Sequence, residues 1–278
     1  MFKKLILVLL FISFNKITSQ NNSDFGKGIK DIERYNSQEI DFIDSEENVK
    51  LSGTLISPKT NYSKIVVITP GSGQNNRNSH YNIAEELLKN GIAVYRFDDR
   101  GVGKSGGKVN FGVDQIIKDL YYALNNLQKI DSLSNKKIGA LGHSLGGIAT
   151  IDAYQNGLKI DFLILMATPI EKFGKFNKPQ YNSRRNPEIK VSTKMLFQNL
   201  QIPMLFIAGT NDSFFNSRET AALIHDLNNK NIEVKIINGF NHFLRAGSDD
   251  WKKTKEYHNL YEIDPQALQE ITSWIAKI

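Results

Sequence analysis

Short, continuous runs of apolar residues alternate along the chain with segments whose apolar residues recur at helical spacing. The runs are typical of strands buried on both faces and lie at 64–69, 92–97, 136–141, 161–167, 203–208 and 232–237. Apolar residues at helical spacing predict helices at 80–90 and 113–129, and further helices are expected at 145–155, 217–229 and 265–278. Such alternation predicts an α/β fold, a mostly parallel central sheet flanked by helices.

The N-terminal third begins differently. Two apolar runs at 40–43 and 49–56 flank an acidic turn and predict an antiparallel hairpin, which brings the sheet to about eight strands. Residues 21–39 are polar and indicate an arm or linker. From residue 40 to 278 the alternation continues, so we expect one domain there. Its segment 168–202 is basic, broken by proline and less regular, which predicts a short cap insertion with one helical piece near its end.

The first twenty residues have the parts of a secretory signal peptide. Lys3 and Lys4 precede ten apolar residues, and small residues follow at Thr18 and Ser19. Ten apolar residues are too few to span a bilayer, which takes about 20. We therefore expect a secreted or periplasmic protein without stable membrane insertion after cleavage; an uncleaved interfacial anchor is the alternative.

Charge and cysteine content narrow the function classes. The formal net charge is +6, and removal of 1–20 takes away three lysines and no acid, leaving +3. No basic stripe follows the chain, so nucleic acid is not an expected partner. The chain has no cysteine, which excludes disulfides and thiolate metal sites.

A strand–turn–helix pattern carries the clearest chemistry. Residues 136–149 read KKIGALGHSLGGIA, so G-x-S-x-G, with Ser144 at its centre, joins a predicted strand to a predicted helix. This is the context of a nucleophile elbow, where a serine sits on a strained turn. Gly142 and Gly146 give that turn the space it requires. A glycine-rich turn with an incidental serine is the alternative.

A serine hydroxyl needs a base and an acid that orients the base. In parallel α/β sheets such groups gather beyond the carboxyl ends of the strands. Among five histidines, His242 lies just after a predicted strand, and Asp212 follows another. Asp161 and Glu219 are weaker candidates for the acid. The order Ser144, Asp212, His242 is the one expected for this elbow.

Two backbone N–H groups are expected to bind the oxyanion. One belongs to Leu145, which follows the nucleophile, and the other to the loop after the strand at 64–69. In that loop Ser72 is the best candidate because Gly71 and Gly73 allow close approach of the backbone. An ordinary glycine-rich turn is the alternative for this loop.

A second glycine-rich stretch matches a nucleotide-binding motif in sequence. Residues 101–106 match G-x-G-x-x-G after a strand, but no helix begins within the glycines, as a dinucleotide site requires. Lys104 and Ser105 do not complete a P-loop, since Asp98 stands where its first glycine belongs. Nucleotide binding is therefore not expected here.

Together these motifs resemble the α/β-hydrolase superfamily over about residues 40–278, and its bacterial esterase and serine-aminopeptidase-like branch most of all. The resemblance rests on the loop at 70–73, the D-R-G-x-G-x-S pattern at 99–105, the elbow, Asp212, and the histidine in Asn241-His242-Phe243. The tail, from 256–257 through 263–275, is also similar. The resemblance implies an architectural role for the 99–105 loop, with Arg100 supporting the site.

Two positions depart from that family pattern. Pro70 stands where relatives usually carry a histidine, and the segment 168–202 is short for a lid, which predicts a fairly open site. The expected reaction is hydrolysis of a small carboxylic ester, without metal or organic cofactor. A peptidase or amidase on the same machinery, and a binding protein on a hydrolase scaffold, are the alternatives. The basic residues of the predicted cap, 168–202, favour an acidic or carbohydrate-linked substrate. A solvated charged surface is the alternative interpretation of these residues.

Overall fold

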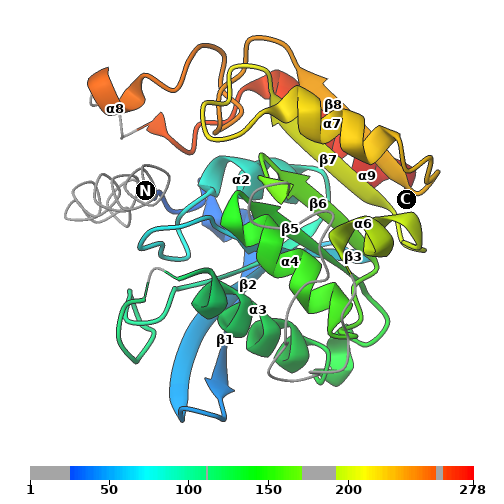
Figure 1. Cartoon of the computed structure of the whole chain (residues 1–278). Helices are drawn as coiled ribbons and strands as arrows, with labels where there is room; N and C mark the ends of the chain where they lie inside the picture. Colours follow the sequence, from blue (N-terminus) through cyan, green and yellow to red (C-terminus); the bar gives the residue numbers. More distant parts are fainter. Residues whose placement is uncertain (1–25, 111, 171–191, 255–258) are drawn as a thin grey trace, which may run out of the picture.

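The computed structural model describes residues 26–110, 112–170, 192–254 and 259–278. Within them eight strands form one sheet in the order β1-β2-β4-β3-β5-β6-β7-β8 (Figure 1). The strands are β1 Tyr35–Asp44, β2 Val49–Pro58, β3 Lys64–Thr69, β4 Ala93–Phe97, β5 Lys137–His143, β6 Phe162–Met166, β7 Met204–Gly209 and β8 Ile232–Ile237. β2 runs antiparallel to β1 and β4, and the remaining neighbours are parallel. The predicted mostly parallel sheet is confirmed.

The N-terminal hairpin is longer than predicted. β1 begins at Tyr35, and Tyr35 pairs with Pro58 at the far end of β2. Four of the first five residues of β1 are exposed and polar, so the sequence there lacks the apolar alternation that marks a strand. Backbone pairing with β2 holds this part of the strand, and residues 35–39 belong to the sheet rather than to an arm.

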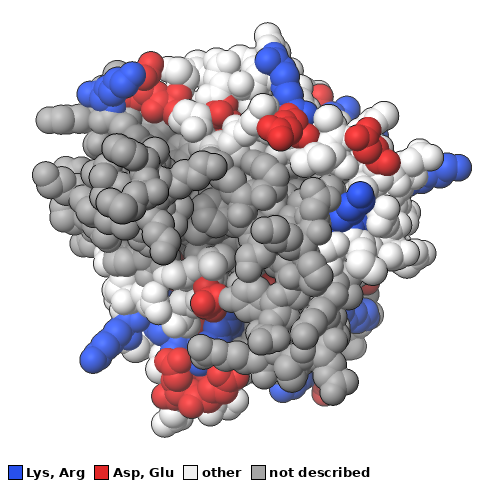
Figure 2. Space-filling model, viewed as in Figure 1, with Lys and Arg blue, Asp and Glu red and all other residues white. Residues whose placement is uncertain are grey.

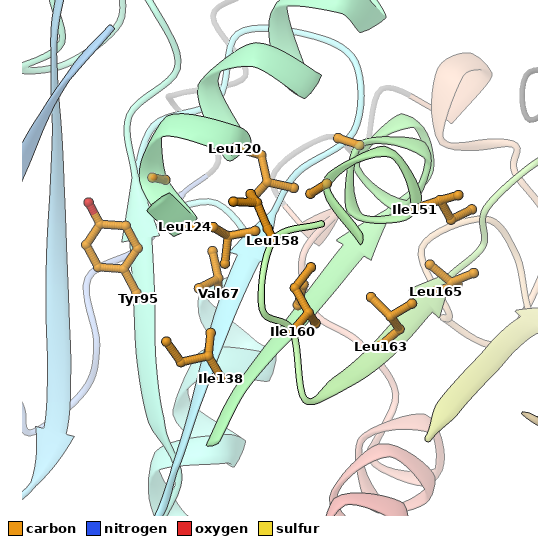
Figure 3. Close-up of a cluster of buried hydrophobic side chains, with 14 of the residues drawn as sticks. Val67, Tyr95, Leu120, Leu124, Ile138, Ile151, Leu158, Ile160, Leu163 and Leu165 are labelled. Carbon is orange, nitrogen blue, oxygen red and sulfur yellow. The ribbon is translucent and has the colours of Figure 1, made fainter. Parts of the chain in front are cut away.

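Two groups of helices cover the two faces of the sheet. The helices are α2 Tyr81–Lys89, α3 Val113–Leu127, α4 Leu145–Gln155, α6 Thr193–Gln198, α7 Ser217–His225, α8 Trp251–Thr254 and α9 Pro265–Lys277. α3 and α4 pack with Val67 and Ile138 on one face, while α2 and α9 pack with Val66 and Ile68 on the other. Figure 3 shows the first of these clusters, with Leu120 and Leu124 of α3 above the sheet. Successive β3 side chains therefore enter opposite cores, which explains its unbroken apolar run.

The helix ends follow local rules that the sequence already carries. The Asp264 carboxylate accepts a hydrogen bond from the Gln266 N–H, and Pro265 fills the first turn of α9. α8 was not predicted, because its four residues are too few to show a helical period.

The order of the strands reverses at β3. β4 and β5 lie on its opposite sides, which makes β3 the switch point of the sheet. Ligands of parallel α/β sheets bind at such a point, beyond the carboxyl ends of the strands. β8 forms the other edge of the sheet, pairs with β7, and is half-buried along most of its length.

The predicted signal peptide at 1–20 and most of the predicted cap, 171–191, lie outside the described residues. In the part of the chain that is described, no helix is long and apolar enough to cross a membrane.

Candidate active site

Ser144 occupies the sharp turn between β5 and α4. Its backbone has φ 54° and ψ −121°, a conformation that non-glycine residues rarely adopt. Two hydrogen bonds hold the turn: the Ser144 N–H donates to the Met166 carbonyl at 2.9 Å, and the Gly147 N–H donates to the Ser144 carbonyl at 3.0 Å. The strained strand–turn–helix geometry is that of a nucleophile elbow.

The two glycines of the elbow lie where no side chain fits. A Cβ on Gly142 would collide with the carbonyl of Gly146, and a Cβ on Gly146 would collide with the carbonyls of Thr69 and Pro70. Both contacts are with backbone atoms, which cannot move aside. The helix thus passes close to β5 and to the end of β3, as the sequence predicts.

Asp212 and His242 come together from separate loops. Asp212 follows β7 and His242 follows β8, and the Asp212 Oδ2 atom lies 2.7 Å from the His242 Nδ1 atom. Both side chains are almost completely buried, and the ring of Phe214 packs on the imidazole with a centroid distance of 4.3 Å. A carboxylate only accepts hydrogen bonds, so Nδ1 carries the proton and Nε2 is left as the basic atom.

His143 joins this pair to the elbow. Its Nε2 atom lies 3.0 Å from the His242 carbonyl oxygen, and the two rings are 4.9 Å apart. His143 immediately precedes Ser144, so this contact joins the loop that carries His242 to the residue before Ser144. Sequence reasoning missed this contact, because a hydrogen bond to a backbone carbonyl far along the chain has no sequence signature.

His80 completes a row of three histidines. Its Nε2 atom lies 3.0 Å from His143 Nδ1. The His242 carbonyl can only accept, so His143 Nε2 carries a proton, His143 Nδ1 accepts, and His80 Nε2 donates. Burial lowers the pKa of His80 to about 3 and that of His143 well below its ordinary value, so both rings are neutral at pH 7. The row therefore has a fixed direction of hydrogen bonding.

The loop after β3 lies directly against Ser144. A Cβ placed on Gly71 would lie 3.0 Å from the Ser144 Cβ and 3.5 Å from its Oγ. Ser72 therefore follows a residue in contact with the elbow, and Gly73 has φ 117°, which favours glycine. Leu145 is the first residue of α4, where backbone N–H groups lack partners within the helix. The two expected oxyanion donors thus belong to segments that meet at Ser144.

Asn75 holds the loop in place. Its side-chain Nδ2 donates to the Gly71 carbonyl at 3.2 Å, and its backbone N–H donates to Asp99 Oδ2 at 2.8 Å. The Tyr261 hydroxyl donates to Asn75 Oδ1 at 2.8 Å. Burial raises the pKa of Asp99 to about 8. Sequence reasoning missed this support, because its members are far apart in the chain.

Arg100 ties the loop after β4 to the hairpin and to α3. It is buried, and it forms ion pairs with Asp44 at 2.6 Å, Asp119 at 2.7 Å and Glu47 at 2.7 Å. Figure 2 shows acidic side chains gathered at the lower end of the molecule, over the β1–β2 hairpin of Figure 1. The structure gives Arg100 an architectural role, at a distance from the elbow along the loop.

The glycines at 101–106 fold around a carboxylate. The Lys104 N–H donates to Asp98 Oδ2 at 2.9 Å, Arg77 forms an ion pair with the same oxygen at 2.8 Å, and a Cβ on Gly103 would contact that carboxylate. The loop thus closes on a negatively charged carboxylate.

The two weaker candidates for the acid lie elsewhere. Asp161 Oδ2 accepts a hydrogen bond from the Ile138 N–H at the beginning of β5, the opposite end of that strand from Ser144. Glu219 lies in the first turn of α7, where its N–H donates to the capping Asn216. Neither has a contact with His242 among those described.

Three comparisons with known proteins bear on this site. The family model described as serine aminopeptidase, S33, matches residues 60–184, which include the loop after β3 and the elbow. An uncharacterized protein of Rickettsia prowazekii is 26% identical over 185 residues, or 65% of this chain and 70% of that protein. An esterase of Pyrococcus furiosus superposes with a TM-score of 0.65, at 22% identity, over 91% of this chain and 95% of that one. The structural similarity shows that this chain has the α/β-hydrolase fold.

A second solved structure shares this fold. A lidless α/β serine hydrolase of Xanthomonas campestris has a TM-score of 0.55, at 18% identity, over 87% of this chain and 94% of that one. These similarities support a hydrolase. The family match ends before Asp212 and His242, so the pairing of those two residues rests on the geometry of the structure itself.

No metal centre is evident in the described part of this chain. Within 26–110, 112–170, 192–254 and 259–278, no group of three or more His, Cys, Asp or Glu side chains is arranged to hold an ion.

Proposed function

We propose that this protein is a serine hydrolase that cleaves carboxylic esters through an acyl-enzyme, with Ser144, His242 and Asp212 as its catalytic triad. The observation that carries the proposal is the buried Asp212–His242 hydrogen bond, whose histidine contacts the residue next to the strained serine. A surface loop that merely contained these residues would not need an aspartate and an imidazole paired out of solvent beside such an elbow.

The reaction begins when Ser144 Oγ attacks the ester carbonyl carbon and its proton passes to His242 Nε2. Asp212 holds Nδ1–H and stabilises the imidazolium that forms. The N–H groups of Ser72 and Leu145 bind the carbonyl oxygen as it becomes an oxyanion. Collapse of the tetrahedral intermediate breaks the C–O bond, and the alcohol leaves with the proton from His242.

Deacylation repeats these steps with water. His242 Nε2 takes a proton from a water molecule, whose oxygen attacks the acyl carbon, and the second tetrahedral intermediate releases the acid. The proton returns to Ser144 Oγ, so the enzyme is regenerated without a metal or organic cofactor.

The decisive experiment compares wild type with Ser144→Ala and His242→Ala on p-nitrophenyl acetate. We expect losses on the order of 10³-fold or more in kcat, since removing a triad member leaves only binding and the oxyanion donors. A fluorophosphonate probe should label the wild type at Ser144 and neither variant, with the site identified by mass spectrometry. Equal turnover in wild type and Ser144→Ala would refute the proposal, and a folded wild type without activity or labelling would favour a binding protein.

The match to a serine aminopeptidase family favours a second candidate, a peptidase or amidase on the same triad. Amide hydrolysis requires that His242 protonate a leaving amine. An aminoacyl p-nitroanilide measured beside the matched p-nitrophenyl ester separates the two. A kcat/KM on the anilide equal to or above that on the ester would assign the protein to peptide substrates.

Substrate class and location complete the proposal. A panel of acyl chain lengths, with acetylated and feruloylated sugars, tests whether the basic segment 168–202 selects acidic or carbohydrate-linked esters. We also propose export through the signal peptide at 1–20. N-terminal sequencing of protein recovered from the periplasm or medium should then begin near residue 20, and full-length protein confined to the cell would contradict it.

A further inference from the structure

Asp249 has a place in the site that the sequence did not indicate. It lies in the loop between β8 and α8 and is half-buried. Its Oδ1 atom accepts the His242 backbone N–H at 3.0 Å, and its Oδ2 atom accepts the Ser213 backbone N–H at 2.8 Å. The Trp251 Nε1–H lies 3.3 Å from Oδ1. One carboxylate thus binds the chain at the catalytic histidine and at the residue that follows the catalytic acid.

The two Asp249 bonds and the Asp212–His242 bond together form a closed ring of hydrogen-bonded groups. Asp212 binds the His242 ring through their side chains at 2.7 Å, and Asp249 connects the same two segments through their backbones. The segments follow different strands, and Asn211 also joins them: its N–H donates to the Phe240 carbonyl at 2.8 Å, and its Nδ2 donates to the carbonyls of Gly239 and Gly247. Asp249 adds the bonds that reach the backbone at His242 and Ser213 themselves. A carboxylate suits this bridge because one oxygen accepts the His242 N–H and the other accepts the Ser213 N–H, so neither backbone donor is left unpaired.

His242 is held on its other side as well. Its carbonyl accepts from His143, so its N–H, its C=O and its ring Nδ1 each have a defined partner. The turn that carries it is closed by Asn241, whose Oδ1 accepts the N–H groups of Phe243 and Arg245 at 3.0 and 3.1 Å. Rotation of the backbone at His242 would break at least one of these bonds.

We propose that Asp249 is a positioning residue that fixes His242 relative to Asp212, and this inference rests on the proposed function. It does not touch substrate or the reacting atoms. Its effect passes through the Asp212–His242 bond, on which the tautomer and direction of the imidazole depend.

The first test measures kcat and KM of Asp249→Ala and Asp249→Asn on p-nitrophenyl acetate. We expect Asp249→Ala to lower kcat about 10- to 100-fold, because small displacements of catalytic groups cost up to about 10² in rate, while KM changes less than about threefold. In Asp249→Asn only one backbone N–H is left facing an amide NH₂, so the decrease in kcat should be smaller than in Asp249→Ala. Asp249→Glu keeps both acceptor oxygens and should recover most of the activity.

Asp250→Ala is the matched control. Asp250 is the next residue, is exposed, and its carboxylate pairs with Lys253 and Ser248. Its variant should keep kcat within about twofold of wild type, as expected of a surface substitution away from the site.

A double-mutant cycle separates positioning from general stability. In an Asp212→Ala background the Asp212–His242 bond no longer exists. Adding Asp249→Ala should then lower kcat by less than about a further threefold. Losses that multiply instead would overturn the proposal, as would wild-type kcat in both Asp249→Ala and Asp249→Asn. Failure of both variants to fold, with Asp250→Ala folded, would make Asp249 a structural residue and also overturn it. Activity that survives Ser144→Ala would refute the proposed function itself, whatever the Asp249 variants show.

Discussion

Replacing Gly71 with alanine tests how closely the loop after β3 approaches the nucleophile. The new methyl group would lie 3.0 Å from the Ser144 Cβ, 3.2 Å from the His143 carbonyl oxygen and 3.5 Å from Ser144 Oγ. Two of these contacts are shorter than ordinary van der Waals separation, so the loop or the elbow must shift by a few tenths of an ångström. The methyl would also occupy space within attack distance of Oγ, about 3–3.5 Å, where a substrate carbonyl must approach.

We expect the substitution to affect catalysis far more than stability. Overpacking of this degree costs about 1 kcal/mol of unfolding free energy, the low end of the usual range. Displaced reacting atoms should lower kcat/KM about 100-fold, which corresponds to about 2.7 kcal/mol of transition-state stabilisation.

The assay combines ester kinetics with the rate of fluorophosphonate labelling and a thermal melt of each variant. Gly28→Ala is the control, because a Cβ there meets nothing within 4 Å, and it should retain wild-type kinetics. A Gly71→Ala variant with wild-type kcat/KM would refute the inferred contact between the loop and Ser144. A large drop in melting temperature with proportionate loss of folded protein would show that the glycine serves folding rather than the site.

Three further predictions follow from the same structure. Ser72→Pro removes the proposed oxyanion N–H and should lower kcat about 100- to 1000-fold, whereas Ser72→Ala should stay within a few-fold of wild type; equal kcat values would exclude that donor. Arg100→Met leaves Asp44 and Asp119 buried beside an apolar chain and should cost about 3–5 kcal/mol in urea unfolding, with a loss under about 1 kcal/mol contradicting the buried network. Burial raises the pKa of Asp99 from 3.8 to about 8, so the folded chain binds a proton that the unfolded chain does not, and stability should fall as pH rises toward 8. Urea unfolding at pH 6.5 and 8 should show this fall in wild type and not in Asp99→Asn; the same slope in both would disprove it.

Most strands could be predicted because they are short, continuous apolar runs, and α2 and α3 could be predicted because their apolar residues recur at helical spacing. β8 and α4 have the predicted bounds, and the ends of β4, β5 and β6 differ by one or two residues. The prediction was wrong at the beginning of β1, where pairing with the neighbouring strand forms the strand without a hydrophobic pattern in the sequence. Residues 35–39 of β1 are polar and exposed, yet the backbone of β2 holds them in the sheet.

Site residues could be predicted when they directly follow buried strands. Ser144, Asp212 and His242 each do so, and the structure brings the latter two together at 2.7 Å. Asp249 could not be found in this way, since its partners are backbone N–H groups that have no sequence signature. His143 was visible in the motif, but its bond to the His242 carbonyl depends on how β8 and its loop pack against the elbow.

The position of β8 bears on how this protein would lose activity. The strand that leads to His242 lies at the edge of the sheet, pairs with β7 and is half-buried from Ile232 to Ile236, whereas β3 and β5 lie inside the sheet and are largely buried. Edge elements with fewer buried contacts open locally at lower free energy than central ones. Mild denaturant should therefore abolish activity by releasing the loop that carries His242, while the central strands remain folded. Amides of β8 would then exchange with solvent sooner than those of β3, and inactivation would precede unfolding.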